Sequence, residues 1–146
     1  MAKDIGGGVL GPLSNSEKTS LNAYINDIKF AGTRTETISL NADLLRLNIN
    51  IYFDAIYQEP ALLSRVESAI DRFLKTLPFN GEILESKIVD AIQAVPGVDD
   101  VEVISFEADP GGGFVGMGRA YKSASGYAVI DPLAPLSSTI TFIANV

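Results

Sequence analysis

Apolar residues at every second position predict one long β-strand near the middle of the chain, from Leu45 to Asp54. Successive side chains of a strand point to opposite faces, so one face of this strand is apolar and the other is polar. The apolar positions are Leu45, Leu47, Ile49, Ile51 and Phe53, and the polar face carries Arg46, Asn48, Asn50 and Tyr52. A strand with one wet face is typical of an antiparallel or mixed sheet that is covered on a single side. We therefore interpret the polar strip as a solvated sheet face rather than as a ligand-binding strip.

Apolar residues three and four positions apart predict three helices, at residues 14–32, 59–77 and 85–95. The first begins with polar caps and an acidic residue that suit the positive end of a helix dipole, and the second has a proline in its first turn. The third ends at Pro96-Gly97. The first helix carries a narrow stripe of Leu21, Tyr24, Ile25 and Ile28. We expect this stripe to pack in the core, with packing on a neighbouring protein as the alternative.

Further strands are expected on both sides of these helices. Thr33–Leu40 is β-prone with alternating polarity, and Val101–Phe106, Tyr127–Ile130 and Ser138–Val146 also read as strands. In the last of these, Ile140, Phe142 and Ala144 share one face, whereas the proline-rich residues 131–135 suit an exposed loop or edge. Together the elements predict an α+β fold of two layers, with a mixed or antiparallel sheet and two or three helices packed on one face.

The chain has the length of one ordinary domain. Its 146 residues are 47% hydrophobic and 20% charged, which is typical of a globular protein. We expect a flexible, glycine-rich leader at residues 1–13 and a single α+β domain at residues 14–146, with a glycine-rich loop at residues 109–118.

Composition argues for a binding or scaffold protein rather than an enzyme. There is no cysteine and no histidine, so the commonest nucleophile for redox chemistry, the commonest general base and the commonest transition-metal ligand are all missing. The net charge of −7 disfavours binding to nucleic acid or to an anionic membrane surface. The apolar runs are too short to span a membrane, and no signal peptide follows Met1. We expect no cofactor and no catalytic residue.

The glycine-rich segment Gly111–Gly118 is the best candidate for a functional loop. A dinucleotide or P-loop site needs a helix after the glycines or a G-K-[ST] motif, and neither follows here. We interpret the segment as a mobile hairpin or insertion loop that exposes large apolar side chains for a protein contact. The candidate interface residues are Phe114, Val115, Met117 and Tyr121.

Three segments together resemble a known family. They are LPFNGEILESKIVDAIQAVPGVDDVEV at Leu77–Val103, YINDIKFAGTR at Tyr24–Arg34 and LRLNINIYFD at Leu45–Asp54. Their order and spacing resemble the C-terminal domain of phage baseplate J-like proteins, of the kind found in phages and prophages of Bacteroidetes-type bacteria. These are wedge components of phage tails and related contractile injection machines. The resemblance runs from Leu13 to Val103 and fades after Glu107.

The resemblance implies a structural protein of the virion, made in the bacterial cytoplasm. Its partners would be other tail or baseplate proteins and copies of itself, so that it is a homo-oligomer in the assembled particle. Longer relatives carry a segment similar to residues 2–7 in their interior. Met1 would therefore begin either an excised C-terminal module or an unusually short member.

Two other functions were weighed against this one. Some members of the group carry a nucleotidyltransferase label, but that chemistry needs carboxylates spaced to hold two magnesium ions. The adjacent Asp99 and Asp100 would point to opposite faces of a strand and, with Glu102, suit a turn instead. The order of helices and strands also resembles small ferredoxin-like modules that bind ligands or act as regulatory domains, and this is the alternative function.

Overall fold

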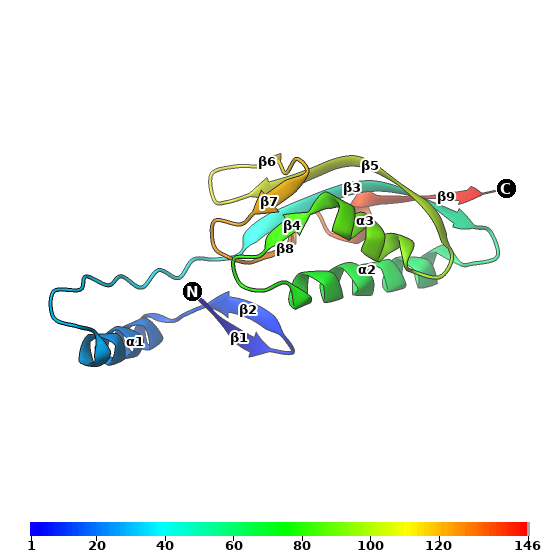
Figure 1. Cartoon of the computed structure of the whole chain (residues 1–146). Helices are drawn as coiled ribbons and strands as arrows, with labels where there is room; N and C mark the ends of the chain where they lie inside the picture. Colours follow the sequence, from blue (N-terminus) through cyan, green and yellow to red (C-terminus); the bar gives the residue numbers. More distant parts are fainter. Residues whose placement is uncertain (146) are drawn as a thin grey trace.

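A five-stranded mixed sheet forms the centre of the computed structural model, which describes residues 1–145 (Figure 1). Its strands run in the order β6–β5–β3–β8, and β9 also pairs with β3. The elements along the chain are β1 (Ala2–Gly6), β2 (Val9–Pro12), α1 (Asn15–Ile28), β3 (Asp43–Asp54), α2 (Glu59–Thr76), β4 (Glu82–Leu84), α3 (Glu85–Gln93), β5 (Val98–Asp109), β6 (Val115–Gly116), β7 (Ala120–Lys122), β8 (Ala128–Ile130), α4 (Leu136–Thr139) and β9 (Ile140–Asn145).

Strand β3 organises the sheet because it has partners on both edges. Along its whole length buried and half-buried residues alternate, as the apolar and polar positions of the sequence predict. It pairs antiparallel with β5, where Leu47 lies opposite Phe106 and Ile51 opposite Val101. Each fully buried leucine or isoleucine of β3 contributes about 1.5–3 kcal/mol to stability. The half-buried face makes cross-strand hydrogen bonds, such as that from Asn48 to Ser105 at 2.8 Å.

Helices α2 and α3 cover the apolar face of the sheet (Figure 1). Helix α2 buries Leu62, Val66 and Ile70, which are four residues apart and therefore lie on one side of the helix. Helix α3 buries Ile88 and Ile92 for the same reason. Helix α3 ends at Gln93, and the chain then turns at Gly97, which has a φ of +102°. A Cβ at Gly97 would lie 2.8 Å from the ring of Tyr57.

The other edge of β3 is shared by two short strands that run parallel to it. Strand β8 pairs with residues 43–45, and β9 pairs with residues 49–54. Between them the chain leaves the sheet at Asp131, whose N–H donates to the carbonyl of Leu45 at 2.9 Å. It then passes through one helical turn, α4, and returns as β9.

The predictions for this part of the molecule are confirmed. The α+β class, the mixed sheet, the long central strand, the helices at residues 59–77 and 85–95 and the strand at residues 127–130 all occur in the structure. Of the predicted strand at residues 138–146, residues 138–139 belong to α4 instead and Val146 lies outside the described residues. Within it Ile140 is buried and Phe142 packs on the core, whereas Ala144 is exposed.

The first 42 residues, which we call the arm, differ from their predictions. The expected leader at residues 2–12 forms an antiparallel hairpin of β1 and β2, and residues 33–40 form no strand. Helix α1 forms where it was predicted, but it buries none of its residues. The expectation that its stripe packs in the core is therefore wrong, because this helix projects beyond the hairpin, away from α2 and the sheet (Figure 1). The division into a flexible leader and one domain at residues 14–146 stays a prediction.

Candidate protein-interaction surface

The four residues predicted to form an interface separate into two groups. Val115 lies on β6 and is 53% exposed, and Phe114 beside it is half-buried. Met117 is only 4% exposed and belongs to the core, and its N–H donates to the carbonyl of Phe106 at 2.9 Å. Tyr121 packs against the same core. The expectation of an exposed Met117 is wrong, because β6 returns along β5 and carries the chain back over the sheet. Whether any of the four contacts a partner stays a prediction.

Phe114 is held in place by an arginine from the central strand. The guanidinium carbon of Arg46 lies 3.8 Å from the centre of the Phe114 ring, within the range of a cation–π contact. The Arg46 Nε also donates to Asp131 at 2.7 Å. The Leu133 N–H and then this arginine hold the pKa of the Asp131 carboxyl below its usual range. Residues 131–135 form a loop, as predicted, but Asp131 itself is buried.

The glycine-rich loop is closed by a carboxylate of the chain itself. One oxygen of Asp109 accepts hydrogen bonds from the N–H of Gly111 at 2.7 Å and of Gly113 at 2.9 Å. These two donors, with Gly113 the stronger, lower the pKa of Asp109. Because the amides that would face a phosphate point at Asp109 instead, the loop is a self-contained turn.

A second buried carboxylate, Asp43, fixes residues 121–125 to the start of β3. It accepts hydrogen bonds from the Tyr121 hydroxyl at 2.5 Å, from the Ala124 N–H at 2.8 Å and from the N–H and hydroxyl of Ser125 at 3.1 and 2.8 Å. Burial, and then the bond to Asp43, raise the pKa of Tyr121. We call this set the Asp43 cluster. It explains why Tyr121 faces inward, and it is structural, since all four donors come from the chain itself.

Large exposed apolar side chains gather on the arm. Tyr24 is 62% exposed, Ile28 is 61% exposed and Phe30 is 88% exposed. Ile5, Ile38 and Leu40 are exposed as well. Such groupings mark interaction surfaces more often than isolated exposed residues do. The sequence contained the signal for this surface in the helical stripe, but we assigned the stripe to the core.

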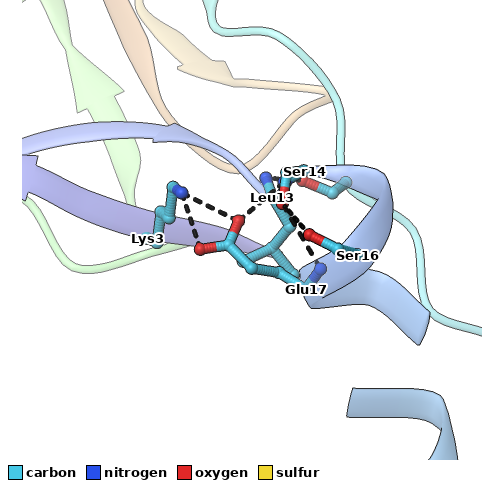
Figure 2. Close-up of polar contacts among 6 residues, drawn as sticks. Lys3, Leu13, Ser14, Ser16 and Glu17 are labelled. Atoms are coloured by element: carbon cyan, nitrogen blue, oxygen red, sulfur yellow. Dashed lines mark hydrogen bonds and ion pairs between the residues drawn. The ribbon is translucent and has the colours of Figure 1, made fainter. Parts of the chain in front are cut away.

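Polar contacts join the hairpin of the arm to the start of α1, as Figure 2 shows. Lys3 of β1 donates to both carboxylate oxygens of Glu17 at 2.7 Å. Glu17 also accepts from the Ser14 N–H at 2.8 Å, while its own N–H donates to the Ser14 hydroxyl at 3.3 Å, which completes a capping box. The ion pair with Lys3 and then the cap lower the pKa of Glu17 to about 2. This cap stabilises the start of α1 by about 0.5–2 kcal/mol.

A groove of about 350 Å³ lies between the arm hairpin and the body of the molecule. We call it the hairpin groove; its apolar lining includes Val9, Leu10, Leu74, Ala128, Ile130 and Leu136. The charged side chains of Glu67, Asp71 and Lys75, all on α2, also line it, and Lys75 pairs with Asp71 at 2.9 Å.

No metal-binding group of three or more acidic residues is found among residues 1–145. In the same part of the chain no helix is long and apolar enough to cross a membrane. Asp99 and Asp100, which we rejected as metal ligands, lie exposed on β5, where the Asp99 carboxylate accepts from Asn145 at 3.1 Å. The expectation that they belong to a turn is therefore wrong.

A comparison with protein families found one match, to the baseplate J-like protein C-terminal domain at residues 45–110. A search of curated proteins found no match. The matched residues include the central strand β3, both covering helices and β5, which together form the core of the sheet. They include two of the three segments that carry the resemblance, Leu45–Asp54 and Leu77–Val103, but not Tyr24–Arg34. Residues 45–110 of this chain are therefore similar to the baseplate J-like protein C-terminal domain.

Proposed function

We propose that the chain is a structural component of a phage tail baseplate or a related contractile-injection-like assembly, and that it acts through protein–protein contacts. Its partners are other baseplate proteins and copies of itself, and it carries no catalytic site. The family match supports the baseplate role. The single observation that carries the role of contacts is the arm, because a well-capped helix projects from the body and exposes Tyr24 and Ile28 of its apolar stripe, while Leu21 and Ile25 are half-buried.

Helix α1 would gain stability by packing its apolar face on a partner. An isolated helix of about 14 residues is marginally stable in water, and most helical stability in proteins comes from packing an apolar face. The capping box and the Lys3–Glu17 pair stabilise the start of the helix, but they do not pack its apolar face. A partner surface would supply it at a low ordering cost, because the helix is already formed.

The body supports a scaffold role in a different way. Its sheet and covering helices form one hydrophobic core, and its two deeply buried aspartates, Asp43 and Asp131, bind donors of the chain itself and so hold loops in place. No observation favours the ligand-binding module, so we do not propose it.

The test is whether the chain is part of a particle. The gene would be tagged in the genome that carries it, particles would be purified, and their tails would be examined by mass spectrometry and electron microscopy with a label against the tag. We expect the label at the baseplate and tails that fail to assemble when the gene is deleted. Tails that assemble normally without the chain, and that lack it when it is present, would refute the proposal.

A further inference from the structure

We infer that α1 of one copy of this chain docks in the hairpin groove of a second copy, so that copies join head to tail. The inference rests on the proposed assembly role and names the partner of the arm.

The stripe and the groove are complementary in shape and polarity. Leu21, Tyr24, Ile25 and Ile28 follow the i, i+3, i+4, i+7 spacing by which a helix lays its apolar face into a groove. The hairpin groove is apolar along its floor, and a volume of about 350 Å³ lies in the range of sites that hold a few anchoring groups. A second hollow, between α2 and α3, is lined by four alanines, Val95 and Pro96 but also by Arg65, Arg72 and two serines, so it suits an apolar stripe less well.

Hydrogen bonds within the arm hold α1 in a position away from the groove of its own copy. Helix α1 begins directly after β2, whose Leu10 lines the groove, and projects away from it (Figure 1). The returning chain is bonded back to the same unit, since the Leu13 N–H donates to the Ser39 hydroxyl at 2.8 Å and the Thr37 hydroxyl donates to Asn22 at 2.5 Å. The terminal amine of Met1 donates to the Ile38 carbonyl at 2.6 Å. Turning α1 back into its own groove would break these contacts, whereas the groove of another copy requires no such change.

Charge favours an arm-to-body contact over a body-to-body contact. Residues 1–42 carry four cationic and four anionic side chains, so the whole net charge of −7 belongs to the rest of the chain. Two bodies therefore repel each other, while a neutral arm approaches an acidic body without that cost. Lys29 and Arg34 lie just beyond the stripe, and within residues 1–145 neither forms an ion pair. Glu67 at the groove is a counter-charge for them, whereas Asp71 already pairs with Lys75 at 2.9 Å.

The contact has different surfaces on its two sides, so it is heterologous and leads to a closed ring or an open chain of copies. An open row of copies then has an unoccupied groove at one end and an unbound arm at the other.

The first experiment is sedimentation equilibrium on the purified chain and two pairs of matched variants. The arm variant is Tyr24→Glu with Ile28→Glu, and its control is Ala23→Glu with Asn26→Glu on the opposite side of α1. The groove variant is Val9→Glu, and its control is Ile5→Glu, which is on the same hairpin but outside the groove lining. We expect the parent and both controls to self-associate and each interface variant to weaken association by about a hundredfold or more. Circular dichroism would show that all variants keep their folded spectrum.

Mixing the two interface variants tests the head-to-tail geometry directly. The arm variant keeps an intact groove and the groove variant keeps an intact arm, so a one-to-one mixture should form a dimer and stop there. A mixture that forms no dimer would show that arm and groove do not bind each other, and a parent chain that stops at a dimer would show a reciprocal two-fold contact; either result would overturn the inference. Because the chain has no cysteine, a Tyr24→Cys, Val9→Cys double variant adds a second readout. Oxidation should give covalent oligomers; a disulfide within single chains would also overturn the inference.

The failure of this inference is separable from failure of the proposed function. A parent chain that stays monomeric to about 1 mM, and yet is found in tail baseplates, refutes only the contact between copies. A chain that self-associates through arm and groove but is absent from particles refutes the baseplate role and leaves the contact standing.

Discussion

Replacing Asp43 with asparagine should lower the free energy of unfolding, because it removes acceptors from the Asp43 cluster. Two donors reach each carboxylate oxygen: the N–H and hydroxyl of Ser125 meet one, and the Tyr121 hydroxyl and Ala124 N–H meet the other. Asparagine keeps the shape and one acceptor oxygen but puts an NH₂ group where the second oxygen was. That group is a donor, so two of the four donors lose their acceptor.

The size of the effect follows from these contacts. A hydrogen bond to a charged group is worth about 1.5–3 kcal/mol, and a buried donor without an acceptor costs a further share of its desolvation. Two lost bonds would then cost about 3–6 kcal/mol. Removing a buried charge recovers part of this, because Asp43 no longer has to be desolvated. We expect a net loss of about 2–4 kcal/mol, a large part of the 5–15 kcal/mol typical of a small protein.

Urea unfolding at pH 7, followed by far-ultraviolet circular dichroism, measures this loss. The matched control is Tyr121→Phe, which removes one donor and leaves Asp43 with three, so it should cost only about 1 kcal/mol. Protein concentration must be held fixed, because association of copies would add to the apparent stability. An asparagine variant within about 0.5 kcal/mol of the parent would refute the reasoning, since the cluster would then contribute nothing beyond its shape.

Three further results are expected. Met117→Ala should lower the free energy of unfolding by about 2–4 kcal/mol, and Val115→Ala by less than about 0.5 kcal/mol, in the same urea assay, because only Met117 is buried. Stability should fall as pH rises above about 10, because the unfolded chain loses the Tyr121 proton before the folded chain, whose pKa is raised by burial and by Asp43; urea unfolding from pH 8 to 11 measures this. The support that Glu17 gives to α1 should be complete above about pH 4.5 and be lost as pH falls through about 2, because Lys3 lowers the pKa of Glu17 in the folded chain; a carboxyl titration followed by NMR measures it.

Each of these results has its own control. Equal losses for the Met117 and Val115 variants would contradict the burial assignment. In the alkaline series Tyr121→Phe should flatten the decline, and an unchanged slope in that variant would assign the effect to other groups. For Glu17 the control is Lys3→Met, which should return the carboxyl titration towards 4.5; a midpoint that stays near 2 would mean that the helix cap alone sets the pKa.

The sequence predicted the parts of the fold whose partners are dictated by periodicity. Strand β3 and helices α2 and α3 each carry an apolar face wide enough to require burial, and the core is made where those faces meet. Periodicity also predicted α1, but a stripe shows only that a face is apolar and not what covers it. The stripe therefore predicts the core, whereas in the structure Tyr24 and Ile28 are exposed and no residue of α1 is fully buried.

The missed features share a different cause. Asp43 and Asp131 look in the sequence like ordinary turn residues, and their burial depends on donors about 80 residues away in the chain. Met117 sits among glycines that suggest an open loop, and only the pairing of β6 with β5 shows that the chain turns back over the core. Residues 33–40 have the alternation of a strand but no neighbouring strand in the structure. Contacts between distant residues decide all of these, and local patterns do not encode them.

The two strands on one edge of β3 have a consequence for how the protein is made on the ribosome. Residues 49–54 emerge early, but their partner on that edge, residues 140–145, is among the last parts of the described chain to be synthesised. Until then the nascent chain presents an unpaired backbone edge beside Ile49, Ile51 and Phe53, which is the kind of edge that recruits other unfinished chains. Slow translation should therefore lower the soluble yield more than slow folding of the finished chain does. A chaperone that shields this edge during synthesis should restore the yield.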